Sequence, residues 1–209
     1  MIPLRDDNPT LRVPVLTLLL IVVNVAVFLV QSTRPDPERI PVSEFAGTQS
    51  GMICRYGVVP DRLVDGKVDQ SDLVNQVCAE VNAKEPRVVT LVTHQFIHGG
   101  WLHLAGNMLF LWVFGNNVED RLGRLRFLPF YLLCGIIAAL GQVFVDPGSG
   151  SALIGASGAI SGVLGAYLLL FPRARVLTLV TIIPLRLPAW IVLGAYLAFQ
   201  FMDVSQNSV

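Results

Sequence analysis

The residues with the clearest chemical potential are Gly155-Ala156-Ser157-Gly158, which set a serine between glycines inside an uncharged stretch at 153–171. We predict that an extended loop enters a helix at Ser157. The first backbone N–H groups of a helix have no partner within it, so they bind anions readily. A hydroxyl at that point would be a nucleophile beside donors for an oxyanion. The sequence therefore predicts a reactive serine at position 157.

A second polar group lies earlier in the chain, where His94, His98 and His103 fall within ten residues and Asn107 follows His103 by four. Residues four apart share one face of a helix. We therefore expect His103 and Asn107 to point together into the cavity that holds Ser157. Both donate hydrogen bonds, and near a developing oxyanion each would lower the barrier. For His94 and His98 we expect hydrogen bonds to loop carbonyls instead.

Composition indicates that helices must position these groups within a membrane. The chain has 209 residues, of which 53% are hydrophobic and 14% are charged, against roughly 25% charged in soluble domains. Long uncharged gaps are typical of membrane helices, because about 20 apolar residues span a bilayer. We predict an all-α, polytopic membrane protein with five spans, at about residues 13–31, 101–118, 127–145, 155–171 and 187–202. The net charge of zero does not suggest nucleic-acid binding.

The placement of arginines predicts the orientation of these spans. The loops at 119–126 and 172–186 each carry three arginines, whereas the loop at 146–154 carries none. The positive-inside rule places the two basic loops in the cytoplasm. The N-terminus at 1–12 is then cytoplasmic. The long polar segment at 32–87 is then external, and we expect it to form short amphipathic pieces.

Smaller features complete this topology. Residues 176–185 are apolar but too few to span, so we expect them at the inner membrane interface. Cys54 and Cys78 both lie in the external segment, where a disulfide would survive, but sequence leaves their pairing open. Cys134 lies in a predicted span and is assigned to packing. No metal or cofactor is predicted, because no His-Glu-x-x-His motif occurs and Glu119, the first carboxylate after the histidines, falls on the opposite side.

The predicted helix that begins at Ser157 carries small residues at helical spacing. They form two rows, Gly158, Gly162, Ala166 and Ser157, Ser161, Gly165. Such rows let helix backbones approach closely in lipid. The helix would be about 22 Å long, shorter than the hydrocarbon core of about 30 Å. We therefore expect the loop before Ser157 to dip into the membrane and to line a water-filled cavity that opens outward.

Three motifs, in this order, resemble the rhomboid family of intramembrane serine proteases over roughly residues 88–202. They are His-Gly-Gly-Trp-Leu-His-Leu-Ala-Gly-Asn at 98–107, Glu119-Asp120-Arg121-Leu122-Gly123, and Gly155-Ala156-Ser157-Gly158. The resemblance implies that Ser157 is the nucleophile of a rhomboid-like helical bundle. It implies that His103 and Asn107, with the Ser157 backbone N–H, form the oxyanion hole. Gly155 would shape the site, and Glu119 and Arg121 would tie the loop after the second span to its neighbours.

The resemblance also implies partners, namely single-pass transmembrane substrates cut near the outer membrane face, and the lipid bilayer itself. The family's general base is a histidine on a sixth span, and no histidine follows His103. We therefore expect residues 13–209 to be a rhomboid membrane domain that holds five of six core helices and lacks the last. We expect this sequence to be a truncated rhomboid, such as a fragmentary gene model. The intact parent protein would then be active and this 209-residue piece would be inactive.

The expected location is integral to a membrane, the bacterial plasma membrane being the interpretation that the family suggests. Two alternatives stay open. One is a catalytically inactive rhomboid-like binder of membrane proteins, which the missing base favours and the intact serine and oxyanion set opposes. The other is a small transporter, which the absence of inverted repeats and of charges within the spans opposes.

Overall fold

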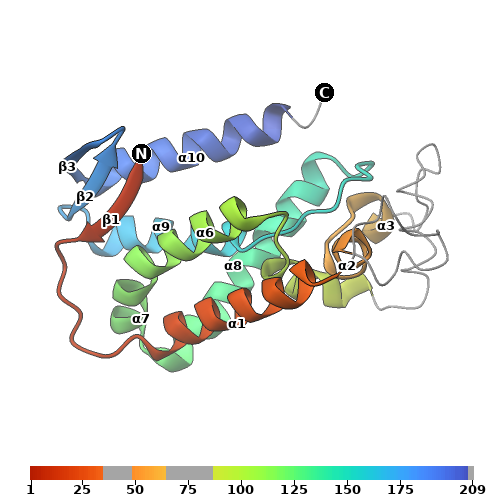
Figure 1. Ribbon diagram of the computed structural model, residues 1–209, viewed down its shortest axis with the longest axis horizontal. Coiled ribbons are helices and arrows are strands. Elements are labelled where there is room, and N and C mark those ends of the chain that lie inside the picture. The colour runs from red at the N-terminus through yellow and green to blue at the C-terminus, as the bar shows by residue number, and fades with distance from the viewer. Residues whose placement is uncertain (35–48, 65–86, 207–209) are drawn as a thin grey trace. The chain divides into compact units, whose positions relative to one another are not determined.

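The computed structural model describes residues 1–34, 49–64 and 87–206, which are mainly helical (Figure 1). They fall into two compact units. The first comprises Met1–Ile21, Gly106–Cys134 and Ile160–Val209, and the second comprises Val22–Ala105 and Gly135–Ala159.

Two of the predicted spans are helices long and apolar enough to cross a membrane. They are α1 (Val15–Ser32) and α8 (Arg124–Val145). The predicted span at 155–171 is the shorter α9 (Ser157–Leu170), and the one at 187–202 is α10 (Ala189–Gln206). Fourteen residues of helix cover only about 21 Å, so α9 by itself does not match a full hydrocarbon core.

The predicted span at 101–118 is helical throughout but changes its winding midway. It consists of α6 (Trp101–Phe110), the π-helical segment η5 (Leu111–Gly115) and α7 (Asn116–Leu122) in direct succession. A π-helical turn inside an α-helix is rare and shifts the faces that follow it. Within the first unit, Leu111 and Phe114 of this segment are fully buried, so the shift serves packing there.

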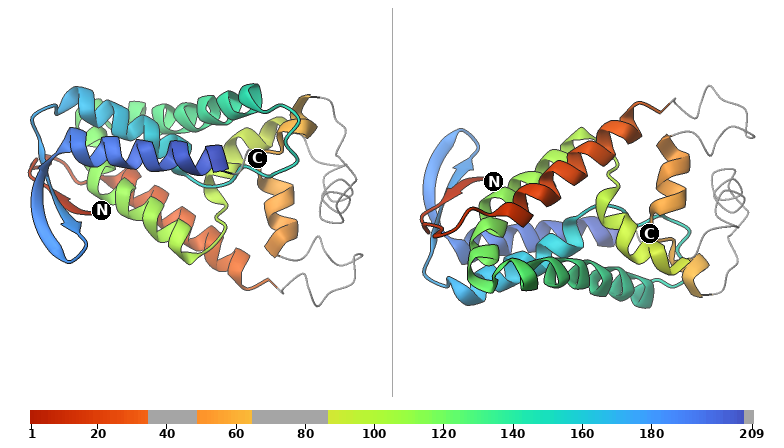
Figure 2. Two further views of the ribbon diagram at one scale, coloured as in Figure 1. Left: turned by 90° about the horizontal axis from the view of Figure 1, so that it is seen from above. Right: turned by 90° about the horizontal axis from the view of Figure 1, so that it is seen from below.

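The all-α expectation is too narrow, because the first unit contains a three-stranded antiparallel sheet (Figure 2). Its strands are β1 (Ile2–Asp6), β2 (Arg175–Val180) and β3 (Ile183–Pro188), with β2 in the centre. Ile2 lies opposite Leu179 in the β1–β2 pair. The N-terminal segment and the hairpin before α10 therefore form one sheet.

Residues 176–185, predicted only as an interfacial apolar stretch, thus form a hairpin. Val176 and Thr178 are fully buried while Arg175 is exposed, which is the alternation of a half-buried strand. β-Branched residues at these positions favour a strand over a helix. Val180 pairs with Ile183, so a two-residue turn joins the strands, and Thr181 in that turn has φ 59°.

The second unit contains the short helices of the segment predicted to be external. These are α2 (Gln49–Tyr56) and α3 (Pro60–Val64), with η3 (Arg87–Val89), α5 (Thr90–Thr93) and η4 (His94–Phe96) after residues 65–86, which lie outside the description. Its core contains Val58, Ala139 and Val143. Cys54 is disulfide-bonded and Cys134 is free, while Cys78 lies outside the described residues.

The first row of small residues on α9 packs against α8. In the second unit, a Cβ atom on Gly158 would lie 2.7 Å from the Ala138 Cβ. In the first unit, a Cβ atom on Gly162 would collide with the Cys134 side chain. The missing side chains therefore set how closely these two helices approach. Gly165, from the second row, is exposed.

Candidate functional site

Ser157 is the first residue of α9, and the loop before it has a conformation that requires glycine. Gly155 has φ 106°, which L side chains rarely adopt, and its N–H donates to the His94 carbonyl at 2.8 Å. Ala156 is fully buried and Ser157 is half-buried. The loop is thus fixed to η4 and turns sharply into the helix. The Ser157 hydroxyl group therefore lies at the start of a helix, where backbone N–H donors are available.

The His-Gly-Gly turn at 98–100 brings His103 toward this loop within the second unit. A Cβ atom on Gly99 would lie 3.6 Å from Ile154 Cδ1 and 3.8 Å from His103 Nδ1. The loop residue Ile154 and the His103 ring therefore approach the same point on the turn. His103 is exposed, so an imidazole accessible to ligands lies near the segment that leads into Ser157.

His98 holds this turn in place from inside the second unit. The Gln31 amide of α1 donates to the His98 carbonyl at 2.6 Å and accepts from the His98 N–H at 3.3 Å. The His98 ring is fully buried and makes an edge contact with His103, their centroids 5.2 Å apart. Neither ring nitrogen of His98 has a hydrogen-bond partner among the described residues, unlike the carbonyl contact expected for it.

Burial keeps the histidines before α6 neutral. Burial, with a smaller electrostatic contribution from His103, lowers the pKa of His98 to about 4. Burial also lowers the pKa of His94, whose Nδ1 lies 2.9 Å from the Thr90 carbonyl oxygen. At neutral pH both rings are therefore uncharged, and His98 contacts His103 as a neutral ring.

Asn107 lies one helical turn after His103 on α6, within the first unit. It is 5% exposed, and its Nδ2 has no hydrogen-bond partner among the described residues. A buried amide donor left unpaired is costly and calls for an explanation. A donor held ready for a transient oxyanion is one such explanation.

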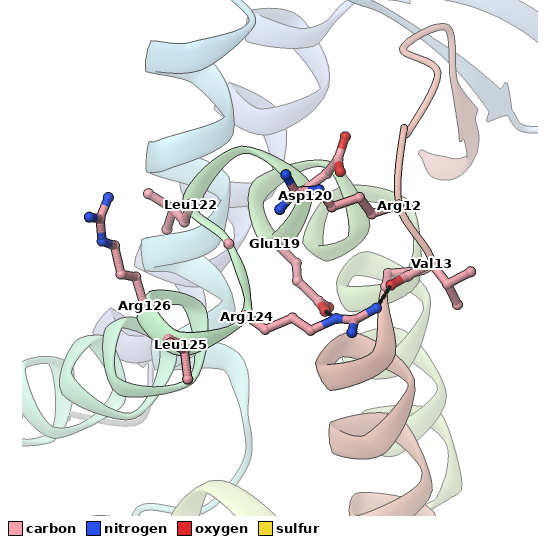
Figure 3. Close-up of a pocket in the computed structure, with 10 residues that line it drawn as sticks. Arg12, Val13, Glu119, Asp120, Leu122, Arg124, Leu125 and Arg126 are labelled. Atoms are coloured by element: carbon pink, nitrogen blue, oxygen red, sulfur yellow. Dashed lines mark hydrogen bonds and ion pairs between the residues drawn. The ribbon is translucent and has the colours of Figure 1, made fainter.

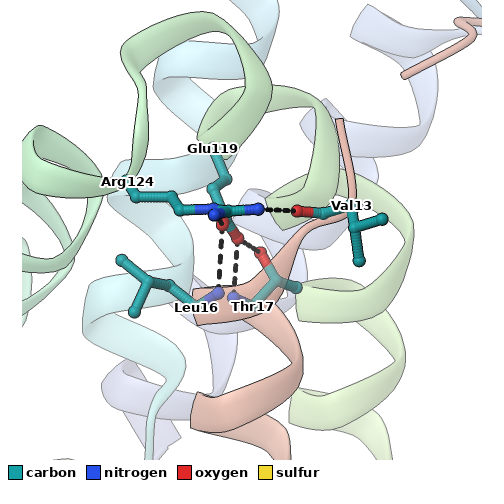
Figure 4. A network of polar contacts seen from close by, with 5 residues as sticks. All are labelled: Val13, Leu16, Thr17, Glu119 and Arg124. Atoms are coloured by element: carbon teal, nitrogen blue, oxygen red, sulfur yellow. Dashed lines mark hydrogen bonds and ion pairs between the residues drawn. The ribbon is translucent and has the colours of Figure 1, made fainter. Parts of the chain in front are cut away.

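Glu119 is 2% exposed and caps the start of α1 within the first unit (Figure 4). Its carboxylate accepts from the Leu16 N–H at 3.0 Å, and from the Thr17 N–H and hydroxyl at 2.7 and 2.8 Å. The arginine beside it is Arg124, whose Nε lies 3.9 Å from Glu119 Oε1. Arg121, which was expected together with Glu119 to tie this loop to its neighbours, is exposed and makes none of these contacts.

Sequence reasoning missed three positioning side chains, Thr17, Gln31 and Arg124. A signal existed for two of them, because Thr17 and Gln31 are polar residues within a mainly apolar helix. Their partners could not be read from the chain. In the part that the structure describes, no three His, Cys, Asp or Glu side chains lie together as a metal site.

Comparison with known protein families matches a Rhomboid domain to residues 85–207, more than half of the chain. The rhomboid protease GluP of Bacillus subtilis is 44% identical over 78 residues, which cover 37% of this chain and 15% of that protein. The putative rhomboid protease YdcA of the same organism is 38% identical over 78 residues, covering 37% of this chain and 39% of that protein.

Rhomboid protein 1, mitochondrial, of Saccharomyces cerevisiae is 34% identical over 100 residues, covering 46% of this chain and 29% of that protein. The chain thus spans well under two thirds of the length of each of these relatives. No solved structure matches it.

Proposed function

Because the chain belongs to the rhomboid family, we propose that it carries the nucleophile of an intramembrane serine endopeptidase. The protein is integral to a membrane, in keeping with its Rhomboid domain and apolar helices. The proposed substrates are single-pass transmembrane proteins, cut near the outer membrane face. The proposed arrangement has residues 1–12 in the cytoplasm, 32–87 outside and five core helices of a six-helix bundle within 13–209, in a bacterial plasma membrane.

The observation that carries this proposal is the loop that leads to Ser157. Gly155 at φ 106°, bonded to the His94 carbonyl, turns the chain so that Ser157 begins α9. The His103 ring and the loop side chain of Ile154 both approach the chain at Gly99. A serine at a helix start, preceded by a loop that an imidazole approaches, supports a role in acyl transfer.

In the proposed reaction, the Ser157 hydroxyl oxygen attacks the scissile carbonyl carbon and gives up its proton to a base. His103, Asn107 and the Ser157 N–H hold the negative charge that develops on the carbonyl oxygen. The C–N bond then breaks, and the departing amine takes the proton, leaving an ester on Ser157. A water molecule hydrolyses the ester and restores the hydroxyl. No metal or cofactor takes part in this scheme.

The base is the component that these residues do not supply. The chain's histidines are His94, His98 and His103. His98 is buried with a lowered pKa, and His103 is assigned to the oxyanion. None of them matches the family's base position, so we assign the base to a histidine outside these 209 residues. The same mismatch favours a second candidate, an inactive rhomboid-like binder of membrane proteins.

The test uses the protein expressed from its complete reading frame and reconstituted in lipid vesicles. A serine-reactive fluorophosphonate and a fluorogenic transmembrane substrate report on the nucleophile and on cleavage. Ser157→Ala should abolish labelling and cleavage, whereas Ser161→Ala, one turn later on α9 and equally half-buried, should keep both. Labelling that persists in the Ser157→Ala variant would refute the assignment of Ser157 as the nucleophile. Substrate capture without labelling or cleavage would identify the binder.

Cleavage measured with residues 1–209 alone tests whether the general base lies outside them. We expect no cleavage from them, because their histidines do not match the base position. Cleavage by this piece that Ser157→Ala abolishes would instead place the base among His94, His98 and His103. That result would leave the nucleophile intact and overturn only the assignment of the base.

A further inference from the structure

A pocket in the first unit has no part in the proposed serine chemistry. It has a volume of about 400 Å³ and is formed where α1 and α8 begin (Figure 3). Arg12, Val13 and Pro14 lie directly before α1, and residues 124–126 open α8 directly after Gly123. Both helices are long and apolar enough to cross a membrane. The pocket therefore lies at the level where membrane helices leave the hydrocarbon and meet lipid headgroups.

The pocket carries positive charge that its own carboxylates do not neutralise. Its walls include Arg12, Arg124 and Arg126, together with Glu119 and Asp120. The Glu119 carboxylate already accepts three hydrogen bonds from the start of α1. Asp120 accepts one from the Leu11 N–H at 2.9 Å. Arg12 and Arg126 are both exposed, and neither forms an ion pair among the described residues.

The three arginines surround the pocket from different sides. Arg126 lies on one side of it and Arg12 on the other, with Arg124 between them (Figure 3). Arg124 is held by a hydrogen bond from its Nη2 to the Val13 carbonyl at 3.1 Å, yet its side chain stays 54% exposed. Guanidinium groups present several donors in one plane and match phosphate oxygens in pairs. Arg124 is thus a donor in a fixed position. The side chains of Arg12 and Arg126 are available to donate hydrogen bonds to a bound ligand.

An apolar surface adjoins this basic one. Leu125 lines the pocket and is 94% exposed, and Val13 is 64% exposed. A soluble anion would gain nothing from these side chains. A phospholipid would use both surfaces, with its phosphate at the arginines and its acyl chains along Leu125. Juxtamembrane arginines attract anionic lipids on electrostatic grounds as well.

We propose that this pocket binds a phosphate group, that of an anionic phospholipid. The site would hold a lipid at the point where α1 and α8 enter the membrane and would join residues 12–14 to residues 123–126. Gly123, at φ 80°, adds no side chain there, and a Cβ atom on it would meet nothing within 4 Å. The proposal does not depend on Ser157 and stands or falls separately from the serine chemistry.

The test is native mass spectrometry of the full protein from dodecyl maltoside micelles that contain equal amounts of phosphatidylglycerol and phosphatidylcholine. The wild type should retain phosphatidylglycerol preferentially. The double variant Arg12→Gln/Arg126→Gln should bind it about 25-fold more weakly, at about fivefold for each arginine. The control Arg5→Gln/Arg173→Gln removes two exposed arginines outside the pocket and should bind as the wild type does.

A parallel arm with inorganic phosphate identifies the source of the phosphate group. Phosphate that competes with phosphatidylglycerol supports recognition through the headgroup phosphate. Phosphate binding without phosphatidylglycerol binding, lost in the pocket variant, supports the site but assigns it to a free anion. Equal loss in both double variants would overturn the proposal, because diffuse charge would then explain binding. Retention of neither ligand by a wild type with an unchanged melting temperature would overturn it too.

Discussion

Replacing Glu119 tests how the chain after α7 holds the start of α1. The Glu119→Ala substitution removes an acceptor of three hydrogen bonds, two from the backbone of Leu16 and Thr17 and one from the Thr17 hydroxyl. The carboxylate is 2% exposed, so the protein rather than water satisfies these donors. Its loss leaves the first turn of α1 uncapped and buried donors without partners.

The magnitude follows from two estimates. A hydrogen bond to a charged group contributes about 1.5–3 kcal/mol, and loss of a helix cap costs about 0.5–2 kcal/mol. The three contacts share one carboxylate, and water entering the vacated space recovers part of the loss. We expect Glu119→Ala to lower the free energy of unfolding by about 3 kcal/mol. Glu119→Gln keeps the shape and one acceptor oxygen, so its cost should be about 2 kcal/mol.

The matched control is Asp120→Ala, the next residue, whose carboxylate makes one exposed hydrogen bond to the Leu11 N–H. Its cost should be at most about 1 kcal/mol. Unfolding in mixed micelles of dodecyl maltoside and sodium dodecyl sulfate, followed by tryptophan fluorescence, gives all three values. The expected order of destabilisation is Glu119→Ala, Glu119→Gln, Asp120→Ala. A Glu119→Ala variant as stable as the Asp120→Ala variant would refute the capping argument.

Three further outcomes are expected. Thr181→Gly should raise the unfolding free energy by about 1 kcal/mol in the same titration, because φ 59° strains a β-branched residue; no gain would show that the turn is unstrained. Gly155→Ala should abolish fluorophosphonate labelling of Ser157 because φ 106° disfavours a side chain, whereas Gly148→Ala, where a Cβ meets nothing within 4 Å, should label normally. The pKa of His98 is lowered to about 4 from 6.5, so the folded state binds fewer protons than the unfolded state between these values. Stability should therefore fall as the pH drops through that window, by up to about 3 kcal/mol, and His98→Phe should flatten the profile.

The parts of the site read correctly from the sequence depend on local patterns. The start of a helix at Ser157 follows from glycines before an apolar run, and α9 does begin there. The spans at 13–31 and 127–145 follow from the length of uncharged stretches, which α1 and α8 match. The packing of Gly158 on α8 follows from small residues at helical spacing. Each of these patterns lies within a few turns of chain, so its physical effect does not depend on distant residues.

The sheet is the part of the fold that local patterns left out. The β2 strand is mainly apolar in the sequence, and its partner β1 lies at the other end of the chain, with Ile2 opposite Leu179. The backbone groups of a strand must form hydrogen bonds, but the strand's own sequence does not determine which segment provides the partners. An apolar run of this length therefore fitted an interfacial segment equally well.

By itself, the sequence determined the membrane class, the helix start at Ser157 and the likeness to rhomboids, because residue type and spacing act over short range. Tertiary structure alone decided which distant groups hold these elements in place. Gln31 clamps the backbone of His98, and Glu119 caps α1 with Arg124 rather than Arg121 beside it. Most buried donors and acceptors in a folded protein are paired, but many remote side chains could satisfy each one. The choice among them is made only when the helices come together.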